Sequence, residues 1–210
     1  MEEPIVALDV GTTKVCTLLG ELNEEGLRVV GVGIAPSRGL RKGVVVNIEE
    51  ATEAIVASLS KAEDISGYQI DRAYVGVSGG HISSVNSRGV AAISRGPRGV
   101  TFEDMDRAMD AAQAIAIPHN RVIIHAIPRG YTLDGQDGVR NPLGLQGYRL
   151  EVEAHVVTGA VPLIHNLVKC VQAAGVEIID LVLGPIAAGE AVLTTAEKEM
   201  GVILVDIGGG

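Results

Sequence analysis

The sequence is poor in aromatic residues and in cysteine: its 210 residues include no tryptophan, one phenylalanine and two cysteines. A core without large aromatic rings has to be built from valine, isoleucine, leucine and alanine. Such a core suits an α/β or α+β protein whose sheet is covered by helices. Cys16 and Cys170 lie in apolar surroundings far apart in the sequence, which favours buried thiols in a reducing compartment over a disulfide.

Basic charge and long apolar runs are also scarce. The formal net charge of −9 argues against the positive surface that attracts nucleic acids and anionic lipids. Nowhere do about 18 consecutive apolar residues occur, so we expect no segment that spans a bilayer. Residues 1–4 lack the basic and apolar regions of a signal peptide. We therefore expect a cytoplasmic protein that binds no nucleic acid.

The hydrophobic pattern predicts an α/β fold that is interrupted by a smaller α+β segment. Asn47 and Thr101 are expected to cap two of the helices. The expected strands are residues 5–10, 14–21, 27–35, 72–77, 89–94, 121–133, 150–156, 177–183 and 201–207. The expected helices are residues 48–66, 102–117, 163–174 and 185–197. Residues 81–159 differ from both flanks in their pattern of expected strands and helices, which indicates an inserted domain.

Two stretches, residues 5–14 and 202–210, share one pattern: an apolar strand leads into an aspartate and a glycine turn. An aspartate where a strand ends lies at the rim of a sheet, beside backbone N–H groups that can approach an anion closely. In the first stretch, the hydroxyls of Thr12 and Thr13 and the cation of Lys14 suit a polyphosphate. The pattern therefore predicts a phosphate site that is built from two turns.

Asp9 and Asp206 could face each other in such a site and hold a hydrated Mg²⁺. This ion commonly takes one or two carboxylates together with waters and substrate phosphates. The chain contains neither a P-loop motif nor the glycine motif of dinucleotide-binding proteins. For residues 9–14 taken alone, an ordinary β-hairpin rich in threonine remains the alternative.

The two turns resemble the phosphate-1 and phosphate-2 motifs of the actin, heat-shock-70 and sugar-kinase superfamily. Residues 75–82, 155–159, 166–175 and 191–194 are similar to one branch, the FtsA family of bacterial cell-division proteins. The resemblance covers essentially the whole chain. It implies an actin-like, ribonuclease H-like subdomain 1A, made of residues 1–80 and 160–210, with an SHS2-like subdomain 1C inserted at residues 81–159.

The same resemblance implies the cofactors ATP and Mg²⁺, with Asp9 and Asp206 holding the metal through water. Carried over by position, the cofactor-binding residues are Asp9, Gly11, Thr12, Thr13, Lys14, Asp206, Gly208, Gly209 and Gly210. Proteins of this family polymerise and link the tubulin-like protein FtsZ to the inner face of the cell membrane at the division site. Later division proteins are expected to bind subdomain 1C. The FtsZ contact, the adenosine-binding motif, subdomains 2A and 2B and a membrane helix are expected beyond residue 210.

Glu190 is the nearest counterpart of the residue that orients the attacking water in actin, and a solvated helix position is its alternative. The expected activity is at most a weak Mg²⁺-dependent ATPase in the full-length protein, with the chain as given inactive. Three other functions stay open. The chain could act only as an interaction module, as an actin-like protein of type IV pilus assembly, or as a sugar kinase or chaperone.

Overall fold

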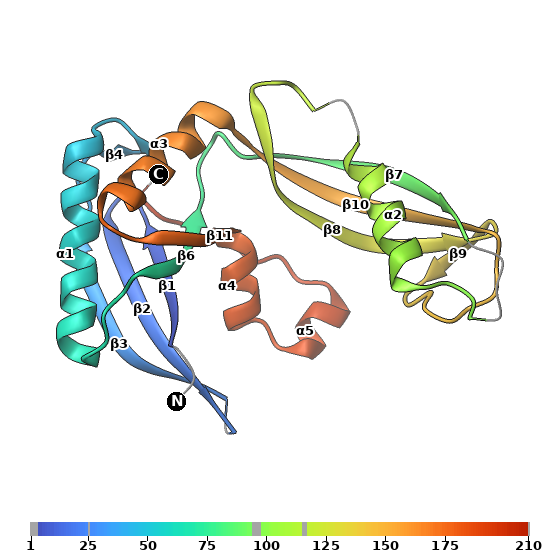
Figure 1. Cartoon of the computed structure of the whole chain (residues 1–210), viewed down its shortest axis with the longest axis horizontal. Helices are drawn as coiled ribbons and strands as arrows, with labels where there is room; N and C mark the ends of the chain where they lie inside the picture. The colour runs from blue at the N-terminus through green and yellow to red at the C-terminus, as the bar shows by residue number, and fades with distance from the viewer. Residues whose placement is uncertain (1–3, 25, 94–97, 115–116, 210) are drawn as a thin grey trace. The chain divides into compact units, whose positions relative to one another are not determined.

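The chain folds into two compact units (Figure 1). The computed structural model describes residues 4–24, 26–93, 98–114 and 117–209. The first unit combines Met1–His81 with Val161–Gly210, and the second unit is Ile82–Ala160. The second unit is thus an insertion between two halves of the first.

The first unit is built on a five-stranded mixed sheet with the strand order β11-β6-β1-β2-β3. β1, β6 and β11 run parallel, whereas β2 is antiparallel to both of its neighbours. The strands are β1 (Ile5–Val10), β2 (Lys14–Asn23), β3 (Gly26–Pro36), β6 (Arg72–Val77) and β11 (Glu177–Leu183). Because three strands run parallel, their carboxyl ends lie at one edge of the sheet, which is where α/β proteins commonly bind ligands.

Helices α1 (Ile48–Ser66) and α3 (Val161–Ala173) pack on one face of this sheet. α1 begins where the sequence predicts, because the side chain of Asn47 accepts hydrogen bonds from the N–H groups of Glu49 and Glu50 at 3.1 and 3.3 Å. It ends at Gly67, whose φ of 74° is a left-handed conformation that favours glycine. The predicted helix 48–66 is therefore confirmed at both ends.

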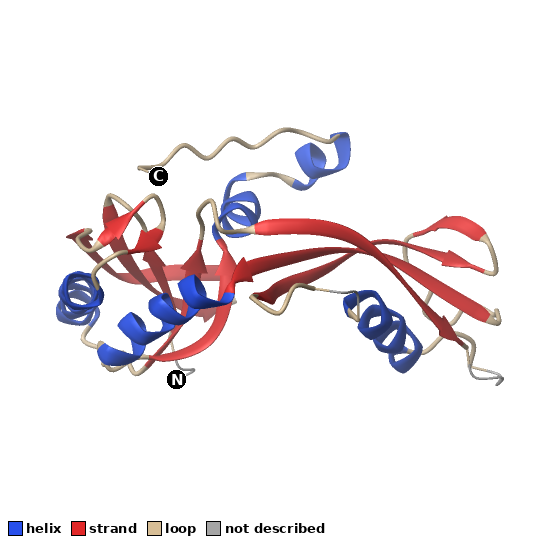
Figure 2. Cartoon of the chain, turned by 90° about the horizontal axis from the view of Figure 1, so that it is seen from above, coloured by secondary structure: helices blue, strands red, loops and turns tan. Residues whose placement is uncertain are grey.

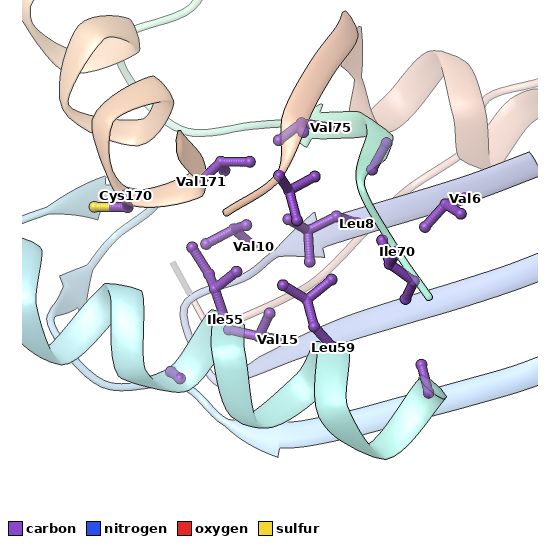
Figure 3. Close-up of a cluster of buried hydrophobic side chains, with 14 of the residues drawn as sticks. Val6, Leu8, Val10, Val15, Ile55, Leu59, Ile70, Val75, Cys170 and Val171 are labelled. Carbon is purple, nitrogen blue, oxygen red and sulfur yellow. The ribbon is translucent and has the colours of Figure 1, made fainter. Parts of the chain in front are cut away.

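The core of the first unit lies between the sheet and these helices, and Figure 3 shows its side chains pointing toward one another. Ile55 and Leu59 from α1 meet Leu8, Val10 and Val15 from the first two strands. Side chains of this kind contribute roughly 1.5–3 kcal/mol each when fully buried. The packing orients β1 so that Val6, Leu8 and Val10 are buried, while Asp9 faces the opposite side of the sheet.

The second unit is a four-stranded antiparallel sheet with the strand order β7-β10-β8-β9. Its strands are β7 (Ser83–Ala92), β8 (Arg121–Leu133), β9 (Gln136–Val139) and β10 (Arg149–Ala160). One helix, α2 (Phe102–Gln113), packs against it (Figure 2). The helix starts at the predicted capping box, in which Thr101 and Asp104 bond to each other's backbone N–H groups.

Two short pairings involve segments outside the predicted strands. β4 (Leu40–Arg41) pairs with β5 (Val44–Val45) around a turn in which Lys42 and Gly43 both have positive φ. β9 follows a similar turn at Asp134 and Gly135. Both turns bring the chain straight back on itself, so the segment after each turn pairs with the segment before it.

The predicted helix 185–197 is wrong as one element, because the structure divides it into α4 (Gly184–Val192) and α5 (Thr195–Met200). The break falls at Thr194, whose hydroxyl accepts a hydrogen bond from the N–H of Glu197 while the Glu197 carboxylate accepts from Thr194. Threonine competes for backbone groups in this way and favours a cap over a helix interior. The local capping box therefore starts a second helix.

The predicted strand 201–207 is also wrong. Residues 201–209 have no regular secondary structure and are exposed throughout (Figure 2). A strand needs a neighbour that pairs with its N–H and C=O groups, and none of the described strands pairs with this segment. Among the described helices, none has the length and apolar character needed to cross a membrane.

Candidate functional site

The turn between β1 and β2 is tight and leaves two backbone donors open. The N–H of Gly11 donates to the carbonyl oxygen of Lys14 at 3.0 Å and closes the turn, so it is not available to a ligand. The N–H groups of Thr12 and Thr13 have no acceptor among the described residues. Two adjacent uncommitted N–H groups in a turn form a concave site that suits an anion.

The hydroxyl of Thr12 is oriented by a neighbouring turn. It accepts a hydrogen bond from the backbone N–H of Gly43 at 2.8 Å. A hydroxyl that accepts at its oxygen keeps its own proton for donation. Thr12 can therefore donate both its N–H and its O–H to an anion. Sequence reasoning missed Gly43, since its contact with Thr12 joins residues 31 positions apart.

Asp9 lies on the face of the sheet that also carries Lys14 and Cys16. Asp9 pairs in register with Cys16 across the β1–β2 hairpin, so their side chains share a face. Burial raises the pKa of the Asp9 carboxyl, Lys14 lowers it, and the charge of Asp206 raises it further. Burial and the Asp9 charge also raise the pKa of the Cys16 thiol. A site that raises the pKa of a carboxylate in this way favours a nearby cation.

Gly76 on β6 makes room for the Asp9 carboxylate. β6 is parallel to β1 with Gly76 opposite Asp9, and a Cβ at Gly76 would lie 3.3 Å from Asp9 Oδ1. That distance is tighter than most real Cβ contacts, so a larger residue would displace the carboxylate. Sequence reasoning missed this residue, although a glycine inside an apolar strand often marks such a close approach.

The second turn meets the first within the first unit. A Cβ at Gly209 would overlap Thr13 Oγ1, so the Gly209 backbone lies directly against that hydroxyl. The charge of the Asp206 carboxylate in the second stretch also contributes to the raised pKa of Asp9. Earlier in the same stretch, the Leu204 side chain would lie 3.9 Å from a Cβ at Gly189 of α4, so residues 201–209 also run beside this helix.

Most of the predicted site residues are therefore close together, although they come from opposite ends of the chain. The structure brings together Asp9, Gly11, Thr12, Thr13, Lys14, Asp206 and Gly209. At Gly208 a Cβ would meet nothing within 4 Å. Gly210 lies outside the described residues.

Glu190 lies on the exposed surface of α4 in the first unit. Its carboxylate pairs with Lys198 Nζ at 2.7 Å across the α4–α5 junction, and its side chain is 74% exposed. A role for Glu190 in catalysis stays a prediction.

The donor set suits a nucleotide phosphate with Mg²⁺. The paired turns present two uncommitted N–H groups, two threonine hydroxyls and one lysine beside two carboxylates. No group of three or more His, Cys, Asp or Glu that could hold a metal by itself occurs within residues 4–24, 26–93, 98–114 and 117–209. An Mg²⁺ at Asp9 and Asp206 would therefore depend on waters and phosphate oxygens for its other ligands.

Comparison with solved structures supports the fold. The chain is similar to the PilM-PilN type IV pilus biogenesis complex with a TM-score of 0.59 and 14% sequence identity, over 89% of this chain and 49% of that chain. At this identity the likeness shows only the fold. The fold is actin-like, and a family model described as the SHS2 domain inserted in FtsA matches residues 79–158.

Comparison with curated proteins gives higher identities over nearly the whole chain. The chain is 49% identical to the cell division protein FtsA of Pseudomonas aeruginosa over 207 residues, covering 98% of this chain and 49% of the relative. It is 41% identical to FtsA of Bacillus subtilis over 208 residues, which are 99% of this chain and 47% of that protein. FtsA of Escherichia coli K12 is 36% identical over 207 residues, 98% of this chain and 49% of the relative.

The chain spans about half the length of the curated relatives it matches. These matches cover both units, whereas the likeness to the pilus complex is one of fold. Over almost its whole length, therefore, this chain belongs to the FtsA family.

Proposed function

We propose that the first unit supplies the phosphate side of an ATP site in an actin-like cell-division protein. The observation that carries the proposal is the meeting of the two turns, in which the Gly209 backbone lies against the Thr13 hydroxyl. A polyphosphate held there would receive hydrogen bonds from Thr12 and Thr13 and would lie beside the Lys14 cation. Charge-assisted hydrogen bonds of this kind are roughly twice as strong as neutral ones.

Asp9 and Asp206 would hold Mg²⁺ through water. The ion supplies positive charge beside the phosphate oxygens when it is bound. Gly76 keeps the Asp9 carboxylate in place, and Gly43 keeps the Thr12 proton turned toward the ligand. The full-length protein is expected to be at most a weak Mg²⁺-dependent ATPase.

Calorimetry with MgATP on the full-length protein tests this function. We expect Gly209→Ala to weaken binding by tenfold or more, because the added Cβ overlaps Thr13 Oγ1 and forces the turns apart. Gly130→Ala is the matched control, since it belongs to neither turn and its Cβ would meet nothing within 4 Å. Wild-type protein that does not bind MgATP would contradict the proposal. If both variants lost the same amount of MgATP affinity, the contact between the turns would not be what determines binding.

The wider role follows from family membership. The full-length protein would polymerise and link FtsZ to the inner face of the cell membrane at the division site, with later division proteins contacting the second unit. The FtsZ contact and the membrane helix would lie outside these 210 residues. Co-sedimentation of the full-length protein with FtsZ polymers and with phosphatidylglycerol vesicles tests both links. Failure to bind either one would contradict that part of the role.

An interaction role for the second unit has its own support. The sheet of this unit carries a polar cavity of about 310 Å³. Its lining includes both charge signs, such as Arg88, Arg129 and Glu153. A charged concave surface suits a polar partner more than an apolar one. If charge-reversed Arg88→Glu and Glu153→Arg proteins still bind every division protein that the wild type binds, this surface is not the contact.

A further inference from the structure

The carboxyl end of β6 lies beside the β1–β2 turn. Asp9 pairs with Gly76 in the parallel register, and Val77 is buried while Ser78 is exposed. β6 ends at Val77, so Ser78 is the first residue beyond this strand and lies at the sheet edge that also carries the β1–β2 turn.

A second contact holds Ser78 at this place. Gly43, whose N–H donates to Thr12 Oγ1 at 2.8 Å, also packs on the end of β6, and a Cβ there would lie 2.7 Å from the Ser78 carbonyl oxygen. Gly43 has a φ of 73°, which favours glycine. One turn thus contacts both Thr12 and Ser78 and sets their spacing.

The Ser78 hydroxyl is chemically available. It forms no hydrogen bond with any residue that the structure describes, and a serine hydroxyl can donate one proton. Gly184 also lies beside Ser78, because a Cβ at Gly184 would be 3.6 Å from Ser78 Cβ. This is an ordinary van der Waals contact and leaves the Ser78 hydroxyl uncovered. Ser78 therefore adds a donor on the β6 side of Asp9, opposite the place where Gly209 meets Thr13.

We propose that Ser78 donates a hydrogen bond to the terminal phosphate of the bound nucleotide. This inference rests on the proposed ATP site. The two turns meet on the β2 side of Asp9, whereas Ser78 lies on its β6 side. A triphosphate that enters between the turns reaches Ser78 with its last phosphate, and a diphosphate ends before it. Ser78 thus distinguishes ATP from ADP.

Calorimetry of the full-length protein with MgATP and with MgADP tests this role. We expect Ser78→Ala to weaken MgATP binding roughly 10- to 100-fold, as the loss of one hydrogen bond to a charged group does, and to leave MgADP binding unchanged. Ser78→Thr keeps the hydroxyl and should bind both nucleotides as the wild type does. Ser78→Cys keeps the size but donates weakly and should behave like the alanine variant. Ser84→Ala, at another exposed serine, is the matched control.

The outcomes separate this inference from the proposed function. If the wild type binds MgATP and Ser78→Ala does so equally well, or loses ATP and ADP affinity alike, the Ser78 role is overturned while the ATP site stands. If the wild type binds neither nucleotide, the ATP site fails and the Ser78 role fails with it. Thermal unfolding of each variant, followed by circular dichroism, shows that the comparison concerns folded protein.

Discussion

The two aspartate turns start from similar sequences and have different structures. In the first, β1 pairs with β2 along its whole length, from Ile5 opposite Gly20 to Val10 opposite Val15, and alternate side chains are buried under α1. In the second, residues 202–207 carry the same apolar run and aspartate, yet they are exposed and pair with no described strand. An apolar run therefore becomes a strand only where a neighbouring strand and a helix face are present to receive it.

The two turns nevertheless lie against each other, and they are held in place by different contacts. The first is held by its sheet and by the Gly43 contact with Thr12. The second touches the first at Gly209 and runs beside α4 at Leu204. Changes in the first turn should therefore affect both stability and ligand binding, whereas changes in the second should affect ligand binding alone.

The largest expected effect is on stability, and it compares a core residue before the first turn with a residue in the second stretch. Leu8 is 1% exposed and Leu204 is 39% exposed. Leu8→Ala should lower the free energy of unfolding by about 2–5 kcal/mol, because it leaves a cavity between β1 and α1. Leu204→Ala, the matched change in the second stretch, should alter it by no more than about 0.5 kcal/mol. Urea unfolding followed by circular dichroism measures both, and similar losses would remove the distinction between the turns.

For ligand binding, in contrast, we expect changes in the two turns to have similar effects. Asp9→Asn and Asp206→Asn should each weaken MgATP binding by roughly 10- to 100-fold, because each removes a charged hydrogen-bond acceptor worth about 1.5–3 kcal/mol. Calorimetry on the full-length protein gives the affinities, with Asp180→Asn as an exposed control on β11. Unchanged affinity in the Asp206 variant would mean that the second turn takes no part in the site.

A smaller effect appears in the pH dependence of stability. The pKa of Asp9 is raised in the folded state, chiefly by burial and further by Asp206. The folded protein then binds more protons than the unfolded one between the two pKa values, so stability falls as pH rises through them. Asp9→Asn should therefore raise the free energy of unfolding at pH 7, by less than about 1 kcal/mol because solvent screens this partly exposed group.

That gain should vanish below the ordinary Asp pKa of 3.8, where the wild-type carboxyl is protonated in both states. Denaturant unfolding at a series of pH values from 3 to 7 measures it. A more stable Asp9→Asn variant that has lost MgATP affinity would show that Asp9 lowers the stability of the folded protein but is needed for ligand binding. A variant that is less stable than wild type at pH 7 would contradict the raised pKa.

The smallest expected effect concerns Glu190, which belongs to neither turn. Glu190→Gln breaks an exposed ion pair with Lys198 and should change the free energy of unfolding by less than about 0.5 kcal/mol. MgATP affinity should stay at the wild-type value. Lys198→Gln breaks the same pair and keeps the carboxylate, so it serves as the control. A hydrolysis rate that falls in the Glu190 variant alone would support the catalytic prediction.

Local sequence signals proved reliable where they act over a few residues. The caps at Asn47 and Thr101 start helices as predicted, since each joins a side chain to a backbone group two or three positions away. The alternation in β10 and the hairpin at Gly11–Thr13 were equally readable. The capping box at Thr194 was also present in the sequence and was overlooked, which is why one helix was predicted where two occur.

Contacts between distant residues were not readable in this way. Gly43 and Gly76 look like ordinary loop and strand residues, and their importance lies in what they touch: the Thr12 hydroxyl and the Asp9 carboxylate. The strand predicted at residues 201–207 failed for the same reason. Its apolar pattern is local, but the backbone pairing that makes a strand depends on another segment.

The sequence by itself determined the family, the α/β class and the helix starts at Asn47 and Thr101, because residue identity and spacing carry those features directly. Only the tertiary structure decided that Gly209 lies against Thr13 and that Gly76 faces Asp9. It also decided that the last apolar stretch stays unpaired. Burial and strand register act between segments far apart in the chain, so they take effect only once the sheet has formed.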